Sequence, residues 1–338
     1  MRDYDESDAK VRPNPRGSRP RSKNRPAHED AIPGTVIGVD RGRLSVRLAE
    51  SGRRVTAVKA RELGRHGLVI GDRVGLVGDT SGAEGTLSRI VRRDERDNAL
   101  RRTADDTETA EKVIVANAGQ LAIVTALADP EPQPRMIDRC LVAAFDARMR
   151  PLLVLTKADL ASADALRANY EPLGVTVIET AVLARPDGSA RIDGVEVLRE
   201  QIQDQTTVFV GYSGVGKSTL VNALAPLAAR AVGVVNDVTG RGRHTSSSAV
   251  AIELPGGGWI VDTPGVRSFG LAHVDVEHFI AAFPDVADAA AESCPRGCAH
   301  ESAEAGCALD AWASTPDQVT RVDSIRRLLV SKASGDER

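Results

Sequence analysis

The chain has 338 residues, of which 42% are apolar, and a formal net charge of −3. This length exceeds that of one small domain, and this charge excludes a uniformly basic coat for nucleic acid. We find no apolar leader and no run of about 18 apolar residues that could span a membrane. Composition therefore predicts a cytoplasmic protein of two or three domains without a membrane partner, and we expect a monomer.

Residues 1–31 are polar, rich in Arg, Pro, Ser and Asn, and almost free of large apolar side chains. Such a segment buries too little apolar surface to offset the entropy lost on ordering, so we predict a disordered tail. Seven Lys or Arg and no acidic residue fall between positions 10 and 28. This basic tail serves either to contact RNA or only to keep the protein in solution.

Short alternating runs separated by Gly-containing turns are typical of residues 32–93 and predict a small OB-like β-barrel. The segment contains no Phe, Tyr or Trp, so it lacks an aromatic platform for stacking bases. It holds twelve Lys or Arg against six acidic residues. RNA binding through backbone phosphates and a merely solvated surface both fit this composition. The candidate RNA-contacting cations are Arg41, Arg43, Arg53, Arg54, Lys59 and Arg65.

The remaining chain divides into three parts. Residues 94–112 are charged and lack periodicity, which is typical of a linker. Over residues 113–272 apolar strands alternate with amphipathic helices, which predicts an α/β domain with a largely parallel sheet. Residues 273–338 are predicted to be helical around a Cys/His cluster, and Thr315 and Gln318 form a capping box for the last helix.

A phosphate-binding loop is predicted where Gly211 to Ser218 match the pattern G-x-x-x-x-G-K-[ST]. The apolar run 208–210 precedes it and a helical pattern follows, as this motif requires. Its glycines let successive N–H groups turn toward a phosphate at a helix N-terminus. Lys217 is predicted to neutralise the β- and γ-phosphates and Ser218 to bind Mg²⁺. The predicted phosphate-binding residues are Gly211, Tyr212, Ser213, Gly214, Val215, Gly216, Lys217, Ser218 and Thr219.

A second motif, Asp-Thr-Pro-Gly from Asp262 to Gly265, follows the apolar run 259–261. An Asp at a strand end can hold Mg²⁺, and the N–H of Gly265 can meet the γ-phosphate. Alone this motif would be an ordinary turn. Its position some forty residues after a phosphate loop indicates a sensor of the γ-phosphate.

A guanine-reading motif is predicted at the end of the apolar run 152–155, where the sequence resembles N-K-x-D with Thr in place of Asn. Asp159 would accept hydrogen bonds from N1–H and the 2-amino group of guanine, which adenine cannot supply. Lys157 would pack its stem along the base. The competing interpretation is a strand end with surface charges, which the phosphate loop disfavours. The predicted base-binding residues are Thr156, Lys157, Ala158 and Asp159.

The order of the motifs is unusual, because Asp159 precedes Lys217 by 58 residues, whereas ordinary GTPases carry the guanine motif after the phosphate loop. A parallel sheet tolerates such reordering when the original termini lie close together, since a site is defined in space. We therefore predict a circularly permuted α/β P-loop GTPase domain over residues 113–272.

Four metal-ligand side chains fall within fourteen residues near the C-terminus. Three thiolates and one imidazole suit a closed tetrahedral site for one structural Zn²⁺. The alternative is a set of reduced core thiols. Cys140 lies apart on an apolar helical face and is predicted to be a core residue. The predicted ligands are Cys294, Cys298, His300 and Cys307.

Permuted order, an N-terminal barrel and a C-terminal Cys/His cluster together resemble the ribosome small-subunit-dependent GTPase A family. The specific pieces are TKADL, GYSGVGKSTL, GRGRHTS and DTPGVRSFGL. The likeness implies GTP and GDP as ligands, and late maturation of the 30S subunit with contacts to 16S rRNA. It also implies a switch segment in which Thr245, or alternatively Ser246, joins the Mg²⁺ shell. Val266 has no polar atom that could orient the attacking water, so the likeness suggests His244 for that catalytic role. The alternative is that His244 is an exposed loop residue that contacts rRNA.

Two other functional classes stay open. One is a non-catalytic RNA-binding scaffold that uses GTP as a structural ligand, which a turnover measurement with and without 30S subunits would separate from a GTPase. The other is a P-loop kinase acting on a small molecule, which the guanine motif disfavours and a nucleotide screen would test.

Overall fold

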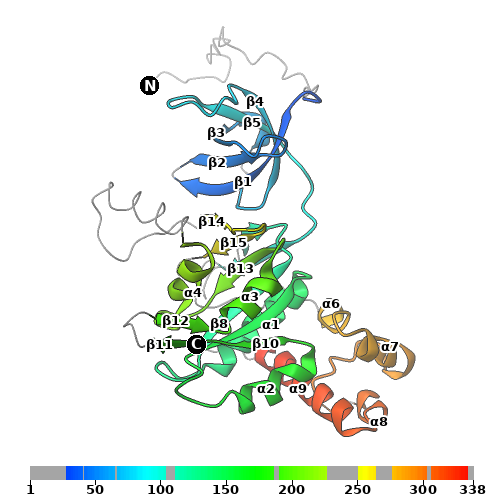
Figure 1. Ribbon diagram of the computed structural model, residues 1–338. Coiled ribbons are helices and arrows are strands. Elements are labelled where there is room, and N and C mark those ends of the chain that lie inside the picture. Colours follow the sequence, from blue (N-terminus) through cyan, green and yellow to red (C-terminus); the bar gives the residue numbers. More distant parts are fainter. Residues whose placement is uncertain are drawn as a thin grey trace, which may run out of the picture.

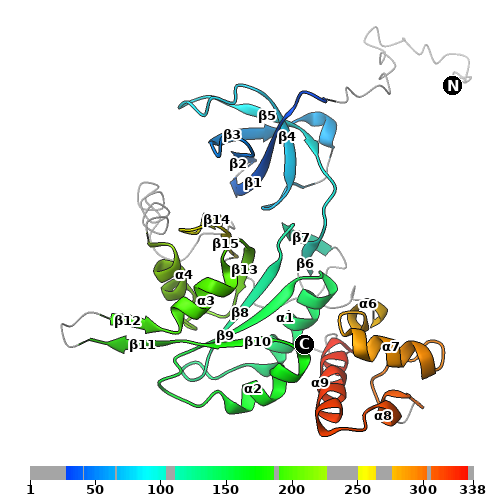
Figure 2. The ribbon, with the colours of Figure 1, turned by 45° about the vertical axis from the view of Figure 1, so that its right-hand side comes forward.

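The computed structural model describes residues 28–40, 42–64, 67–103, 111–185, 190–226, 250–263, 276–302 and 306–333. These residues form a β-barrel, a central α/β domain and a helical C-terminal region that lies beside the central domain (Figures 1 and 2). No helix in these ranges is long and apolar enough to cross a membrane.

Five strands form the N-terminal barrel, and β1 pairs with both β2 and β4 to close it. Valine, leucine and isoleucine side chains on alternate strand positions fill the interior, among them Val36, Val46 and Leu76. The predicted barrel is thereby confirmed. Its elements are β1 (Ile32–Asp40), β2 (Arg43–Leu48), β3 (Arg54–Lys59), η2 (Arg61–Leu63), β4 (Arg73–Gly78) and β5 (Ser88–Arg93).

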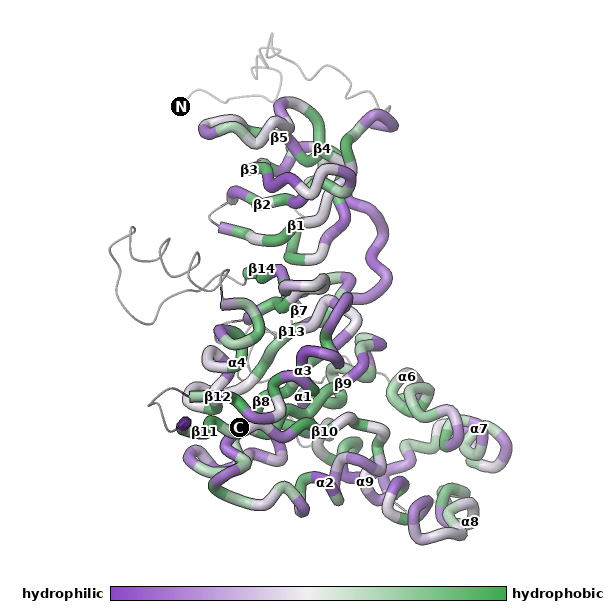
Figure 3. Tube along the Cα trace, in the orientation of Figure 1, coloured by the Kyte–Doolittle hydropathy of each residue, from purple (hydrophilic) through white to green (hydrophobic). Residues whose placement is uncertain are grey.

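The chain leaves the barrel through a hydrophilic stretch after β5 (Figure 3). Where charged composition predicted a linker, the structure has strand β6 (Ala99–Thr103), paired antiparallel with β7 (Glu111–Ala116). Leu100 of β6 is buried in the main hydrophobic core. One buried leucine among charged residues gives no visible periodicity, so this strand could not be recognised from the pattern.

Five parallel strands form the sheet of the central domain, in the order β10-β9-β8-β13-β15, and β14 adds antiparallel at the β15 edge. Gly38 of β1 pairs with Val250 of β14, so the barrel and the central domain share a continuous sheet. The strands are β8 (Gln120–Ala126), β9 (Arg150–Thr156), β10 (Thr176–Glu179), β13 (Thr206–Val210), β14 (Val250–Glu253) and β15 (Trp259–Asp262).

Helices cover both faces of this sheet, so its strands are apolar without alternation. On β8, Leu121 and Ile123 face one core while Ala122 and Val124 face the other. The first core is completed by α1 (Pro134–Asp146), α2 (Asp164–Tyr170) and η3 (Glu171–Leu173), and the second by α3 (Val195–Ile202) and α4 (Lys217–Leu224). A separate hairpin consists of β11 (Ala181–Ala184) and β12 (Ala190–Asp193).

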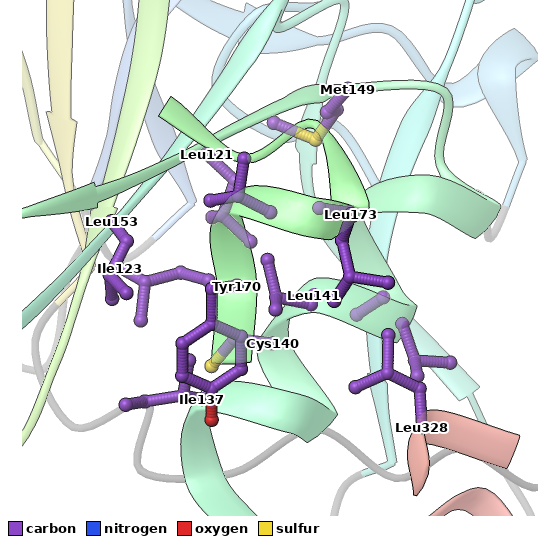
Figure 4. Close-up of a cluster of buried hydrophobic side chains, with 14 of the residues drawn as sticks. Leu121, Ile123, Ile137, Cys140, Leu141, Met149, Leu153, Tyr170, Leu173 and Leu328 are labelled. Atoms are coloured by element: carbon purple, nitrogen blue, oxygen red, sulfur yellow. The ribbon is translucent and has the colours of Figure 1, made fainter. Parts of the chain in front are cut away.

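The larger core joins side chains from distant parts of the chain. Figure 4 shows Leu121 and Ile123 of β8 with Cys140 and Leu141 of α1, and Leu328 from the C-terminal helix. Burial raises the pKa of the Cys140 thiol, so this cysteine is a protonated core side chain.

The C-terminal region consists of α6 (Val276–Ile280), α7 (Pro284–Ser293), α8 (Leu309–Trp312) and α9 (Pro316–Ala333). The predicted capping box is present at the start of α9. Thr315 Oγ1 accepts from the N–H of Gln318, and Gln318 Oε1 accepts from the N–H of Thr315. Val322 and Ile325 then bury one face of the helix, whereas Val319 is exposed.

Candidate nucleotide site and Cys/His cluster

The carboxyl ends of β8, β9, β13 and β15 meet at one edge of the parallel sheet. In sheets of this kind, ligands bind in the crevice outside the carboxyl ends of the strands. Residues after these four ends include the predicted guanine motif, the phosphate loop and Asp262. The fold therefore gathers the separate sequence motifs at a single edge.

The phosphate loop runs from β13 into α4, as its strand–loop–helix context predicted. Gly211 passes close to β8, where a Cβ atom would lie 2.3 Å from the carbonyl oxygen of Val124. Gly216 is the N-terminal cap of α4 with φ +89°, a backbone conformation that favours glycine. Both glycines are therefore needed for the loop to lie against the sheet and to open onto the helix N-terminus.

Charge at the phosphate end of the site is balanced by an ion pair. Lys217 Nζ lies 3.2 Å from Oδ1 of Asp262, and their side chains are 15% and 31% exposed. Thr263 Oγ1 donates to the carbonyl of Phe209 at 3.0 Å, which fixes the chain after β15 against β13. The predicted phosphate-binding lysine and the predicted magnesium ligand thus share one corner.

The guanine motif is tied directly to the phosphate loop. Thr156, at the end of β9, is 5% exposed, and its Oγ1 donates to the carbonyl oxygen of Val215 at 2.6 Å. Although Thr replaces the usual Asn at this position, its hydroxyl makes a link between the two motifs. A buried hydrogen bond of this kind is expensive to break, because the carbonyl would be left without a partner.

Backbone contacts shape the rest of the guanine motif. The N–H of Ala158 donates to the carbonyl of Thr180 at 3.1 Å, which positions the motif beside the turn after β10. Lys157 has a φ of +56°, and its ammonium donates to the carbonyl of Asp129. Asp159 is exposed. The carboxylate predicted to read guanine is therefore on the surface of the site, accessible to a ligand.

The segment after β8 is a part of the site that sequence analysis missed. The carbonyl of Asp129 accepts from Lys157, and a Cβ atom added at Gly214 would lie 3.9 Å from Pro130 Cδ. These residues therefore lie between the guanine motif and the phosphate loop. No sequence motif marks Asp129 and Pro130. Only their position after a strand of the parallel sheet could have indicated that they line the site.

Three predicted site residues, His244, Thr245 and Gly265, lie outside the described residues. Arg41 and Arg65 of the predicted RNA-contacting cations also lie outside them. Of the remaining cations in that set, Arg43, Arg53 and Arg54 are exposed on the barrel.

The four predicted metal ligands converge. One ligand atom from each of Cys294, Cys298, His300 and Cys307 lies within 4.8 Å of every other. Cys294 Sγ is 3.9 Å from Cys307 Sγ, and each of these sulfurs is 3.6 Å from His300 Nδ1. Burial, followed by the positive charge of Arg326, lowers the pKa of His300, which favours the neutral imidazole that a metal needs.

These distances fit tetrahedral zinc. With Zn–S bonds of about 2.3 Å and Zn–N bonds of about 2.0–2.1 Å, tetrahedral angles place two sulfurs about 3.8 Å apart and a sulfur about 3.6 Å from the nitrogen. The cluster is thus arranged around a point that a four-coordinate ion could occupy. Three thiolates and one imidazole are also the donors of structural zinc sites.

Comparison with known proteins supports both the permuted order and the family. A family model described as RsgA GTPase matches residues 93–272. A relative from Ectopseudomonas mendocina, named small ribosomal subunit biogenesis GTPase RsgA, is 40% identical over 232 residues, which are 67% of this chain and 65% of that protein. A relative of the same name from Azotobacter vinelandii is 38% identical over 271 residues, covering 78% and 75% of the two chains.

Two crystal structures resemble the whole fold. YjeQ from Thermotoga maritima matches with a TM-score of 0.60 and 23% identity over 88% of this chain and 98% of that one. YloQ, described as a circularly permuted GTPase, matches with a TM-score of 0.63 and 22% identity over 92% and 98%. The predicted permuted architecture is thereby confirmed.

Proposed function

Because the chain belongs to the RsgA GTPase family, we infer that it hydrolyses GTP to GDP and phosphate in the maturation of the small ribosomal subunit. The observation that carries this inference is the hydrogen bond from Thr156 to Val215, which joins the guanine motif to the phosphate loop. One nucleotide can then be held at both ends, with its base at Asp159 and its phosphates at Lys217. This division of labour follows from the chemistry of the two motifs.

In this proposal each motif has a separate task. Asp159 accepts from the guanine edge while the stem of Lys157 packs along the base. The loop from Gly211 to Thr219 surrounds the phosphates with N–H groups, and Gly265 donates to the γ-phosphate. Ser218, Thr245 and Asp262 are proposed to hold Mg²⁺. The ion, when bound, neutralises charge that develops on the phosphate oxygens.

We propose His244 as the residue that orients the attacking water, since Val266 follows the DTPG motif and has no polar atom to do so. His244→Ala is expected to keep GTP affinity and to lose at least about a hundredfold in 30S-stimulated turnover, the lower end of the contribution of a positioned general base. Single-turnover kinetics with purified 30S subunits measure this. Unchanged stimulated kcat in the variant would remove His244 from the mechanism.

We propose that Cys294, Cys298, His300 and Cys307 hold one structural Zn²⁺, a proposal supported by the ligand distances given above. In a closed four-ligand site no position is left for water, so the ion would stabilise folding and take no part in hydrolysis. Metal analysis of the purified protein should give one zinc per chain.

For partners, we propose contacts to 16S rRNA through the exposed arginines Arg43 and Arg53 of the barrel, by phosphate neutralisation. We also propose a cytoplasmic monomer with a tail (1–31), a barrel (32–93), a GTPase domain (113–272) and a C-terminal domain (273–338), in which residues 94–112 connect the barrel to the GTPase domain and carry β6. Binding of this type weakens steeply with added salt, which sedimentation with 30S subunits at two ionic strengths measures.

The proposed function is tested by GTP turnover with and without 30S subunits. We expect stimulated hydrolysis of GTP and no competition by ATP. Tight GTP binding without turnover would favour the scaffold interpretation, whereas equal competition by ATP would contradict the guanine site and favour a kinase.

A further inference from the structure

Helix α9 carries an arginine that reaches the Cys/His cluster. Nη1 and Nη2 of Arg326 donate to the two carboxylate oxygens of Asp310, both at 2.7 Å. Asp310 follows the ligand Cys307 by three residues on the same short segment. The Arg326 side chain is only 14% exposed, whereas that of Asp310 is 43% exposed, so in this planar two-point pair the arginine is the shielded partner. Arg326 therefore attaches α9 to the segment that supplies the last ligand.

The pair with Asp310 does not use the whole guanidinium. Nε of Arg326 is buried and has no hydrogen-bond partner among the described residues. The Asp310 carboxylate, and to a smaller extent the sulfur of Cys307, raises the pKa of Arg326, and the charge of Arg326 adds to burial in lowering the pKa of His300. A buried donor without a partner is costly, and this Nε belongs to the guanidinium that Asp310 holds against the segment carrying Cys307.

The net charge of a zinc–thiolate group explains why an arginine would lie next to it. Zn²⁺ with three thiolates and a neutral imidazole carries a net charge of about −1 by the sum of its parts. A buried net charge is unfavourable unless an opposite charge lies beside it. Arginine suits this task because its guanidinium is always charged, weakly hydrated and able to bind an acid with two nitrogens while a third donates elsewhere.

We propose that Arg326 is a positioning residue of the metal centre, which holds Cys307 as a ligand and offsets the negative charge of the zinc–thiolate group. This inference rests on the proposed zinc site. It also connects that site to the central domain, because α9 buries Ile325 and Leu329 in the larger core and contacts α1 and η3. Retention of the metal and docking of α9 would then support each other.

Arg321 on the same helix provides a matched control. Its Nη2 lies 3.0 Å from Oδ1 of Asp285, so it too forms an arginine–aspartate pair. Its guanidinium lies over the ring of Phe283 at 5.5 Å. Neither of these partners is a member of the cluster. Nη1 of Arg321 also donates to the carbonyl of Pro172 in η3 at 2.6 Å. Substitution of Arg321 therefore removes polar contacts of α9 with α7 and η3 and leaves the surroundings of Cys307 unchanged.

The test uses full-length, zinc-loaded protein and follows transfer of zinc to a chromophoric chelator. Arg326→Gln should release zinc at least about tenfold faster than wild type, the scale found when a group behind a metal ligand is removed. Arg326→Lys, which keeps the charge but not the planar pairing, should fall between the two. Arg321→Gln should release zinc at the wild-type rate.

The absorption spectrum of the cobalt-substituted protein provides a second measurement, which loosening of α9 alone would not change. Loss of the positive charge near Cys307 should shift the thiolate-to-cobalt absorption of Arg326→Gln to longer wavelength, with Arg321→Gln unshifted. Equal release rates and spectra in the two variants would overturn the role of Arg326. A wild type that takes up no stoichiometric zinc would instead overturn the zinc site, and the inference with it. Should Arg326→Gln not fold, Asp310→Asn tests the same contact and should also accelerate release.

Discussion

The proposed nucleotide site draws its residues from separate stretches of chain, 156–159, 211–219 and Asp262, whereas the four proposed Cys/His ligands fall within residues 294–307. The first depends on the strand order of the sheet, because β8 must lie between β9 and β13 for Thr156 to reach Val215. The second depends mainly on one local loop, braced by Arg326 from α9. A site formed by several strands of a sheet is preserved when the chain is permuted, because the strands keep their places in space. A cluster formed by one short segment is preserved wherever that segment stands in the chain.

This contrast implies that single residues of the nucleotide site have specific effects on binding and turnover, without loss of the fold. The sheet edge is part of the fold itself, in which Lys217 pairs with Asp262 and Thr156 is bonded to the loop. Removal of a cluster ligand, in contrast, should affect folding of the C-terminal region, because metal binding and folding are coupled at such sites.

The largest expected effect is at the base. Asp159→Asn exchanges a double acceptor for a group that both donates and accepts, which suits xanthine better than guanine. The preference for GTP over xanthosine triphosphate should change by about 10⁴, as for sites built around a substrate hydrogen bond. Competition binding with the two nucleotides measures it. If Asp159→Asn kept the wild-type preference, the base would be bound elsewhere and the comparison of the two sites would fail.

Next is the phosphate end. Lys217→Ala should lower GTP turnover by at least about a hundredfold, because a positioned charge at the transferring phosphate is lost. The fold should be retained, because Lys217 is at the first position of α4 and its ion pair with Asp262 is only partly buried. Turnover together with circular dichroism checks both statements. Loss of folded structure would show that this site, too, is structurally essential.

A smaller effect is expected from the link between the motifs. Thr156→Val preserves shape but leaves the Val215 carbonyl without its donor, at a cost of about 1–3 kcal/mol. GTP affinity should therefore fall by about ten- to a hundredfold, whereas Thr156→Ser, which keeps the hydroxyl, should remain near wild type. Isothermal titration with GTP and GDP distinguishes them. Equal affinities for Val and Ser variants would mean that the link has no role in binding.

The sequence predicted the elements that carry strong local signals. Gly211 and Gly216 with Lys217 identified the phosphate loop, and Thr315 with Gln318 the start of α9. In contrast, Leu100 is a lone buried residue in β6, and Asp129 contributes a backbone carbonyl, which any residue has. Such contacts depend on strands and helices distant in the chain, and no local pattern encodes them.

Arg326 and Asp310 belong to the same class. Each is an ordinary charged residue on a helix, and their pairing across sixteen positions is set by how α8 and α9 pack. The cluster ligands themselves were predictable because thiols at close spacing are unusual. The residues that brace them were not, since charged residues are common on helix surfaces.

The smallest expected effect is where the central domain meets α9. Asp138 of α1 is buried, with Oδ2 at 3.6 Å from Nε of Arg327. Burial raises the pKa of this carboxyl, and Arg327 only partly opposes that change. A carboxyl whose pKa is raised by folding binds its proton more tightly in the folded state. Its contribution to stability is therefore present below the unfolded pKa of about 3.9 and is lost as pH rises through the folded value.

Asp138→Asn removes this titration, so the variant should gain stability relative to wild type as pH rises from about 3.9 through the raised pKa of the folded state. Urea unfolding of both proteins across that range measures the difference, in which the other titrating groups cancel. A difference that stayed constant with pH, or that favoured wild type at high pH, would show that the Arg327 pair fully compensates burial. The junction between the two regions would then be held by the ion pair, and α9 would dock onto α1 through charge as much as through its apolar face.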